Sequence, residues 1–507
     1  MLRRLARQSG VYALAGVVAK AGGVALLFFY GDPDVLPVAD FGYLGLLDAV
    51  KAFALLVAGV GLPLGIIRFS TLPALTDEER AAVPMTSLAL AAVAGAAVAG
   101  AGWAAAPPIS EALFGTPLRA EPVRWLAVYV GLKTVADVSY AVLRQREKAG
   151  AFVLVGALEM AVLVLAVVWS LVVRAEGLAG VMRGYALSAA VTAALVTPAL
   201  LARVERRVRW GLVRPMLAFG LPLVASGLAG RFLNLGDRFL IVHFLGPEAN
   251  AVYEWAARFG GVVNVFLVQS FNLAFAVLGL KALDATGRPD LHRQAFRHFA
   301  ALSGWVVLGL GLFVGDVSRL MTDVPAYAEA DGLALLIAGG FAFYGLYYVV
   351  VNVLYAAGRT GAVAASVGAA ALLNLALNAV LIPTFGIVGA AWATLLAYGA
   401  LAVGTARLGR SYADVAYPWR ALAVVVVLVG GLWMLAQPTE AWPTAARLAA
   451  RVAIAAAYPV GLFALGVYGR GDLARGLDVL RTRGREHDGS TGDPGGESAS
   501  GPDADSR

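Results

Sequence analysis

The sequence predicts an all-α polytopic membrane protein. Sixty per cent of its 507 residues are hydrophobic and only 14 per cent are charged, whereas an ordinary soluble domain carries about 25 per cent charge. Apolar stretches of about 20 residues, the length that crosses a bilayer as a helix, follow one another along the chain with short polar loops between them. No loop is long enough for a soluble domain, so the chemistry of this protein is expected inside the membrane.

Composition also limits that chemistry. The sequence has no cysteine, which excludes disulfides, thiolate metal sites and cysteine nucleophiles. It has only four histidines, no phosphate-binding loop and no nucleophile triad, so we expect no metal, no cofactor and no enzymatic activity. The net charge of +7 lies largely in arginines of the short loops, which fits orientation in a membrane better than nucleic-acid binding.

The spans can be placed in order along the chain. The basic start MLRRLARQ precedes an apolar stretch, 11–30, that is too long for a signal peptide and has no small-residue cleavage site after it. We therefore expect a first helix that stays in the membrane. About 14 spans are predicted in all, near 11–30, 42–67, 84–106, 123–143, 150–173, 180–201, 215–245, 248–280, 296–315, 327–357, 360–383, 387–406, 418–436 and 445–468.

The basic segment RVERRVRWGLVRP, after the sixth span, separates two halves. We expect an N-terminal six-helix lobe over 1–205, a C-terminal six-helix lobe over 206–410 and two additional helices over 411–470. The end of the chain, 471–507, is rich in Gly, Ser and Asp and has almost no large apolar residue after 486. It cannot bury enough surface to fold and is predicted to be a disordered cytoplasmic tail.

The loop charges predict the orientation. Cytoplasmic loops of membrane proteins carry an excess of Lys and Arg, and a cytoplasmic N-terminus places the basic loops consistently on that side. The outer loops are poor in Lys and Arg, and the first of them, 31–40, is acidic. We therefore expect both termini in the cytoplasm and the protein in the cell membrane.

Six cations are predicted to lie within spans, where an ionised side chain costs roughly 2.5 to 3.5 kcal/mol and therefore marks function. They are Lys20, Lys51, Lys133, Arg231, Arg238 and Arg258. All except Lys133 belong to the first two helices of each half. If these four helices face one another, they line a cavity with a net basic wall that attracts anions.

The partners of these cations are partly visible in the spacing. Glu254 and Arg258 are four residues apart and can pair on one helix; for Lys133 and Asp137, at the same spacing, we favour a purely structural ion pair. Asp237 and Arg238 are adjacent, so we expect them to point in different directions and to need partners on other helices. The candidate cavity residues are Lys20, Lys51, Arg231, Asn234, Arg238 and Arg258, with Asp48, Asp237 and Glu254 as charge partners or carriers of a coupling ion.

Three segments carry a family resemblance. Residues 219–267, with a Phe-Gly-x-Pro entry, an Asp-Arg pair and a Leu-Gly turn, resemble the start of the second half of Wzx-type polysaccharide flippases. NLALNAVLIPTFGIVGAAWATLLAYG, residues 374–399, and the segment 40–69 are similar to further motifs of that family. The family belongs to the multidrug, oligosaccharidyl-lipid and polysaccharide exporter superfamily.

The resemblance implies a MATE-like fold of two six-helix bundles, with two extra helices in this chain, and a central opening lined by helices one, two, seven and eight. It also implies a flippase that moves a lipid-diphosphate-linked oligosaccharide to the outer leaflet for surface polysaccharide, such as O-antigen, capsule or exopolysaccharide. The implied partners are a polyprenyl diphosphate-linked substrate, membrane lipid and a polymerase or ligase of the same pathway.

Two alternatives stay open at this point. The first is a cation-coupled drug exporter of the same fold, although such a protein is expected to have buried carboxylates without competing cations like Lys20 and Arg231. The second is a membrane glycosyltransferase or polymerase, with Asp32-Pro33-Asp34 as an acidic motif. Proline between two aspartates also favours a simple turn, and the large outer loop that such enzymes use is missing.

Overall fold

The computed structural model describes residues 22–145, 149–201, 204–284, 289–328, 330–469 and 471–472. These residues form helices and connecting turns and contain no strand, which confirms the all-α prediction. Twelve of the described helices are long and apolar enough to cross a membrane. One of them, Thr360–Gly409, covers two predicted spans. The two spans are separated by a kink at Gly386, whose backbone is non-helical (φ 62°, ψ −147°). The first predicted span lies mostly outside the described residues; its described part, 22–30, is helical.

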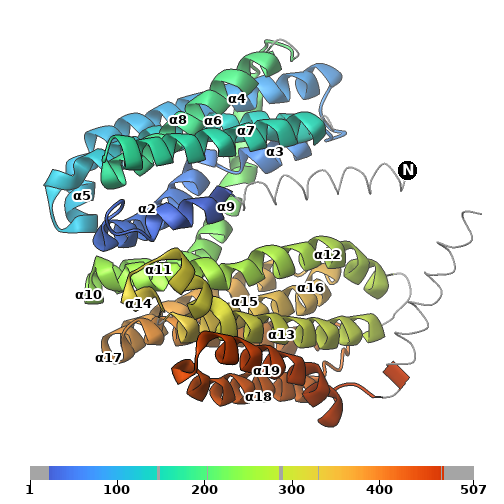
Figure 1. Cartoon of the computed structure of the whole chain (residues 1–507). Coiled ribbons are helices and arrows are strands. Elements are labelled where there is room, and N and C mark those ends of the chain that lie inside the picture. Colours follow the sequence, from blue (N-terminus) through green and yellow to red (C-terminus); the bar gives the residue numbers. More distant parts are fainter. Residues whose placement is uncertain are drawn as a thin grey trace, which may run out of the picture. The chain divides into compact units, whose positions relative to one another are not determined.

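The chain forms two compact units, one up to Pro418 and one from Trp419 onward. In the first half of unit one, α6 packs against both α4 and α8, and α7 packs against α8 (Figure 1). The helices of this half are α2 (Val38–Gly59), α3 (Leu62–Phe69), α4 (Asp77–Ala104), α5 (Ala106–Phe114), α6 (Ala120–Gln145), α7 (Ala149–Val168) and α8 (Gly177–Leu201).

In the second half of unit one, α15 packs against α11, α13 and α17. The helices of this half are α9 (Val213–Leu235), α10 (Asp237–Leu245), α11 (Pro247–Val262), α12 (Gln269–Asp284), α13 (Pro289–Met321), α14 (Pro325–Ala328), α15 (Asp331–Val350), α16 (Asn352–Ala356) and α17 (Thr360–Gly409). The core around α11 is aromatic: the buried Trp255 stacks on Tyr327 with ring centroids 4.7 Å apart, and its indole N–H donates to Ser318 Oγ at 2.8 Å.

The structure divides several spans that the hydropathy pattern predicts as continuous. Span 42–67 breaks between α2 and α3, where Val60 and Gly61 have φ of 42° and 67°; a β-branched residue there is strained, since positive φ favours glycine. Span 215–245 breaks at Gly236, between α9 and α10. Span 248–280 contains a π-helical turn, Val263–Val268. A hydropathy pattern gives the length of an apolar run, but it does not show where the helix breaks within that run.

The halves of unit one meet along α2. A Cβ on Gly42 would lie 1.8 Å from the Pro247 carbonyl oxygen, and one on Gly45 would lie 2.2 Å from Glu254 Cγ. The Asn250 amide donates to the Gly42 carbonyl at 2.7 Å. We call this contact between α2 and α11 the outer seam. Beyond the end of α2, Gly61 lies against Gly220 of α9, where a Cβ on Gly220 would lie 1.9 Å from the Val60 oxygen.

Unit two consists of α18 (Trp419–Ala436), a 3₁₀ turn (Gln437–Ala441) and α19 (Thr444–Ala464). The two helices pack against each other, and Gly461 gives room for Leu428. Arg451, with a side chain only 1% exposed, pairs with Glu440.

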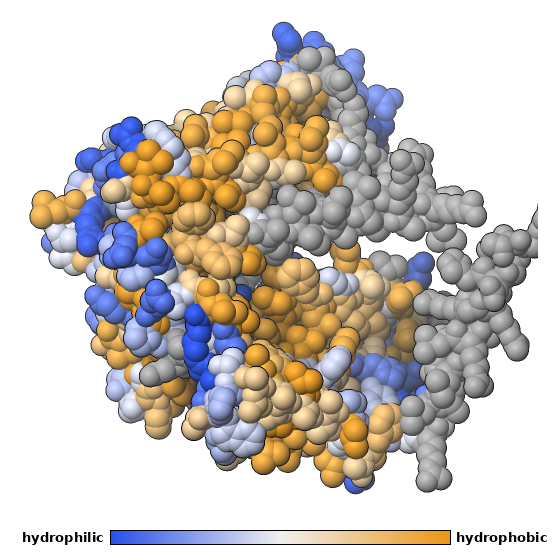
Figure 2. Space-filling model, in the orientation of Figure 1, coloured by the Kyte–Doolittle hydropathy of each residue, from blue (hydrophilic) through white to orange (hydrophobic). Residues whose placement is uncertain are grey.

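The surface matches a lipid environment. Large apolar side chains are exposed along the helices, among them Leu154 and Leu165 on α7, Leu273 on α12 and Leu372 on α17. In Figure 2, apolar residues cover much of the visible helix sides, whereas hydrophilic residues gather toward helix ends and loops. A soluble protein rarely exposes apolar patches of this extent, so this is a multi-pass membrane protein.

Candidate functional site

A network of charged side chains crosses the outer seam. Asp48, on α2, accepts from Lys51 one turn later at 2.5 Å and from Arg258 of α11 at 3.1 Å. Arg258 in turn lies 3.9 Å from Glu254 on its own helix. The Asp48–Arg258 pair therefore joins the two halves directly.

The network continues into α10. Arg238 Nε donates to Glu254 Oε1 at 2.6 Å, and its Nη1 donates to Asp237 Oδ1 at 2.6 Å. The expectation that Asp237 and Arg238 point in different directions is wrong. Asp237 is the first residue of α10, and its carboxylate folds back over the first turn of that helix. There it also accepts a hydrogen bond from the Arg238 backbone N–H at 3.1 Å. Both residues have partners on another helix, as expected. Arg238 pairs with Glu254 of α11, and Asp237 accepts a hydrogen bond from the Tyr253 hydroxyl of α11 at 2.5 Å.

Local sequence makes this arrangement possible. Gly45 leaves space on α2 for the Glu254 side chain. The break at Gly236 gives α10 its own N-terminus, where the helix dipole favours the negative charge of Asp237. The side chains of Asp237, Glu254 and Arg238 are 4%, 8% and 10% exposed, whereas Asp48 and Arg258 are each 23% exposed. The pair that joins the halves is thus the more accessible part of the network.

The network is balanced in charge, with three cations (Lys51, Arg238 and Arg258) and three carboxylates (Asp48, Asp237 and Glu254). In this conformation every cation of the network has a carboxylate partner. An anionic ligand would have to replace those carboxylates.

Asn234 connects the network to a group of tyrosines. The Arg238 guanidinium donates to the Asn234 carbonyl at 3.2 Å, and Tyr398 of α17 donates to Asn234 Oδ1 at 2.5 Å. The Tyr398 ring lies 4.9 Å from that of Tyr344, which belongs to a cluster with Tyr347 and Tyr348 on α15. No acid or base marks this cluster in the sequence, so only the fold reveals its contact with Asn234.

Two candidate cavity residues are not in the network. Arg231 is exposed and forms no ion pair with another residue that the structure describes, although it shares α9 with Asn234. Lys20 lies outside the described residues. The structure thus brings together Lys51, Asn234, Arg238, Arg258, Asp48, Asp237 and Glu254, and the roles of Lys20 and Arg231 stay predictions.

A second charged cluster lies between α6 and α7. Lys133 contacts Asp137 at 3.2 Å, at the predicted i, i+4 spacing, and Glu159 of α7 at 2.7 Å. The Tyr140 hydroxyl donates to the other oxygen of Glu159 at 2.9 Å. The sequence analysis did not name Glu159 as a site residue. Glu159 is nevertheless an isolated acid in the most apolar described span. Because an ionised side chain inside the membrane is costly, an isolated acid there indicates a partner on another helix.

Aromatic rings extend the central network toward the second cluster. The Lys51 ammonium lies 4.1 Å from the Tyr185 ring centroid and 5.9 Å from that of Tyr129, which are favourable cation–π positions. Tyr129 precedes Lys133 by one turn of α6. Contacts of the central network therefore reach from α10 and α11 through Lys51 of α2 to Tyr129 of α6, one turn before Lys133.

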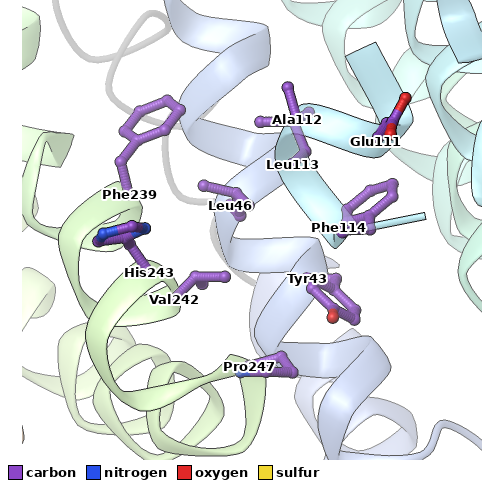
Figure 3. Close-up of a pocket in the computed structure, with 11 residues that line it drawn as sticks. Tyr43, Leu46, Glu111, Ala112, Leu113, Phe114, Phe239, Val242, His243 and Pro247 are labelled. Carbon is purple, nitrogen blue, oxygen red and sulfur yellow. The ribbon is translucent and has the colours of Figure 1, made fainter. Parts of the chain in front are cut away.

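A pocket of about 340 Å³ opens beside the outer seam. Figure 3 shows Tyr43 and Leu46 of α2 and Phe114 of α5 on one side, facing Phe239 and His243 of α10. Its volume is at the lower end of small-molecule sites. Within the part of the chain that the structure describes, there is no group of three or more His, Asp or Glu that could hold a metal ion.

Comparisons with known proteins place this arrangement in context. A family model described as "Polysaccharide biosynthesis protein" matches residues 35–308, a range that holds the whole charge network. The probable multidrug resistance protein NorM of Caulobacter vibrioides is 29% identical over 202 residues, covering 36% of this chain and 41% of that protein. The alignment thus spans less than half of that relative.

Solved structures share the fold. The lipid II flippase MurJ, in an inward closed conformation, superposes with a TM-score of 0.69 at 13% identity, covering 89% of this chain and 97% of MurJ. A multidrug resistance MATE family transporter of the MOP superfamily, in an inward-facing conformation, gives 0.62 at 16% identity, covering 78% and 93%. A Vibrio cholerae MATE transporter, VcmN, gives 0.58 at 15% identity, covering 81% and 96%. The predicted MATE-like architecture is confirmed.

Proposed function

Because the chain belongs to the polysaccharide biosynthesis protein family, we propose that it is a flippase that moves a lipid-diphosphate-linked oligosaccharide from the inner to the outer leaflet. The observation that carries the proposal is the Asp48–Arg258 pair, which links the two halves inside the membrane. The fold is also that of a lipid II flippase. No soluble domain is available to do the work elsewhere in the described chain.

The mechanism follows from the ion pairs. When the halves separate along the outer seam, Arg258 loses Asp48 and keeps only Glu254, 3.9 Å away on its own helix, whereas Lys51 keeps Asp48 on α2. Unpaired charge in an apolar span is costly, so a diphosphate that replaces the carboxylate is favoured at that moment. Its two negative charges suit Arg in particular, whose planar donors bind phosphate oxygens in pairs. The lipid tail stays in the bilayer.

The remaining predicted residues extend this site. We assign Lys20, Lys51, Arg231, Asn234, Arg238 and Arg258 to the substrate cavity, with Asp48, Asp237 and Glu254 as their charge partners. The two lobes, 1–205 and 206–410, alternate around it, with both termini in the cytoplasm. A polymerase or ligase of the surface polysaccharide is the partner that consumes the exported saccharide.

The test is the exposure of the lipid-linked oligosaccharide at the outer leaflet, measured with an impermeant lectin. Cells that lack the protein are complemented with wild type, Lys20→Ala, Arg231→Ala, Arg258→Ala or the control Arg293→Ala, an exposed arginine paired one turn away on α13. We expect exposure to require the protein and to fall at least tenfold in the three cavity variants at equal membrane level, with Arg293→Ala near wild type. Exposure that is unchanged without the protein would refute the flippase function.

The second candidate function is drug export, favoured by the NorM match. A drug exporter would accelerate efflux of a cationic dye from loaded cells, and carboxylates rather than arginines would limit its rate. Dye efflux that depends on this protein while saccharide exposure does not would select this function.

A further inference from the structure

Three arginines lie at one end of α17 without a carboxylate partner. Arg359 directly precedes the helix, Arg407 lies in its last turn and Arg410 follows it; we call them the α17 arginines. The Arg359 guanidinium lies 5.2 Å from the ring centroid of Tyr412, so the two ends of α17 are neighbours. All three arginines are exposed, and none forms an ion pair with another residue that the structure describes, including Asp414 in the segment that follows α17.

Other exposed arginines of this chain are neutralised locally. Arg80 pairs with Asp77 at 2.5 Å, and Arg293 pairs with Asp290 at 3.1 Å. The bias of Lys and Arg toward cytoplasmic loops accounts for positive charge at helix ends, but it does not require that this charge stay unpaired. The α17 arginines are therefore open to an anion from outside the described chain.

An apolar pocket lies between the two arms of α17, on the membrane side of the α17 arginines. Its volume of about 190 Å³ is smaller than the roughly 300 to 1,000 Å³ of small-molecule sites. All of its lining residues belong to α17, among them Ser366, Leu373, Leu401, Gly404 and Leu408. Leu408 follows Arg407 directly, and Ser366 and Leu373 lie about 10 and 20 Å from Arg359 along the first arm, at a rise of 1.5 Å per residue. The pocket thus begins near the arginines and runs into the span.

We propose that this end of α17 binds one anionic phospholipid, whose phosphate is held by the α17 arginines and one of whose acyl chains occupies the pocket. The proposal goes beyond the proposed function and does not depend on it, since such a lipid site would serve a flippase or a drug exporter equally.

The two parts of the site match the two parts of the lipid. Arginine binds phosphate oxygens in pairs through its planar donors, and each cation near an anionic membrane surface adds to the attraction. Tyr412 is exposed beside Arg359, and tyrosine is enriched at the level of lipid head groups. Leu373 and Leu408 line the pocket and are also exposed, so an acyl chain reaches the pocket from the bilayer.

A phosphate on an alkyl chain also describes the proposed substrate, but that substrate is assigned to another place. The diphosphate site proposed above uses α2, α9, α10 and α11, whereas the residues of the lipid site lie on α17 or next to its ends. Free phosphate has no chain to fill the pocket. The surrounding bilayer supplies anionic phospholipid continuously, which makes it the occupant that fits both parts.

The experiment is native mass spectrometry of the purified full-length protein, released from detergent micelles and titrated with phosphatidylglycerol or with phosphatidylcholine of the same acyl chains. We expect wild type to bind phosphatidylglycerol about tenfold more tightly or more, because three cations favour the anionic head group. The combined variant Arg359→Gln, Arg407→Gln, Arg410→Gln should lose this preference. A matched control replaces three other exposed arginines of the chain by glutamine and should retain it; these are Arg206, Arg207 and Arg214.

The pocket is tested separately with Gly404→Leu. A Cβ on Gly404 would meet nothing within 4 Å, so the larger side chain extends into the pocket. It should weaken binding of both lipids about tenfold, the effect of losing roughly two buried methylene groups. Gly368→Leu is the control: Gly368 lies on the first arm of α17 outside the pocket lining, and its Cβ would also meet nothing within 4 Å.

The proposal is overturned by equal affinity of wild type for the two lipids, by an unchanged preference in the α17 variant, by an equal loss in the control triple variant, or by unchanged binding in Gly404→Leu. Two competitors distinguish the sources of phosphate. Displacement of phosphatidylglycerol by an equal concentration of polyprenyl diphosphate would assign the site to the substrate, and displacement by inorganic phosphate would make it a site for free anions; both results contradict a phospholipid site. The readout involves no saccharide, so its failure and that of the flippase function are told apart.

Discussion

At the scale of single residues, Glu254 is the central member of the seam network, the charged side chains that cross the outer seam between α2, α10 and α11. It accepts from Arg238 at 2.6 Å and lies 3.9 Å from Arg258, so it balances two arginines on two helices. Asp48 is more exposed, and Arg258 keeps a second carboxylate when Asp48 is removed. The two acids therefore differ in what their loss leaves behind. Loss of Glu254 leaves the buried Arg238 with Asp237 alone, whereas loss of Asp48 leaves the more accessible Arg258 with Glu254 nearby.

We expect Glu254→Gln to destabilise the protein more than Asp48→Asn. Removing one partner of a buried ion pair costs about 3 to 5 kcal/mol, whereas a partly exposed pair contributes about 0 to 1 kcal/mol. The check is the thermal denaturation midpoint of the two purified variants in the same detergent and at the same scan rate. Equal shifts of the midpoint would contradict the assignment of Glu254 as the central member.

At the scale of elements, α2 depends on small residues where it meets α11. Gly42 and Gly45 face Pro247 and Glu254 with no room for a Cβ, and close helix packing through glycine is common in membranes. These glycines are not needed for backbone conformation, since both lie inside a regular helix. Their value is the distance they allow between the halves.

We expect Gly42→Ala to impair saccharide exposure strongly, since its Cβ would lie 1.8 Å from a backbone oxygen that a side-chain rotation cannot move. Gly59→Ala is the matched control: it lies on the same helix and its Cβ would meet nothing within 4 Å. The lectin assay at equal membrane level measures both. Similar effects of the two substitutions would mean that helix propensity, and not the seam, is responsible.

At the scale of the whole molecule, the positive loops predict the orientation of the chain. The absence of cysteine makes the prediction easy to examine, because a single introduced cysteine has no background. Asp34 lies in the predicted first outer loop and Arg206 in the predicted basic inner loop, and both side chains are exposed.

We expect Asp34→Cys to react with a membrane-impermeant maleimide in intact cells and Arg206→Cys to react only after permeabilisation. The physical reason is the bias of Lys and Arg toward cytoplasmic loops. Mass-shift labelling with and without detergent measures both sites. The reverse pattern would invert the topology and the direction of the proposed transport.

The sequence by itself determined the class of fold, the approximate number and order of spans and the presence of intramembrane charge. These follow from the length of apolar runs and from the rarity of ionised residues in lipid. It also indicated most members of the seam network, because Glu254 and Arg258 are close in sequence and Asp48 and Lys51 are close on another helix.

The tertiary structure decided which charges meet. Asp48 and Arg258 are 210 residues apart, and nothing in local spacing pairs them; that contact exists because Gly42 and Gly45 let α2 approach α11. The same holds for Glu159 and Lys133, which lie on different helices, and for Tyr398 and Asn234. The breaks at Val60 and Gly386 also needed the fold, since a hydropathy window records apolar character and not backbone dihedral angles. A charged residue within an apolar span is visible in the sequence, but the packing of the helices determines which residue neutralises it.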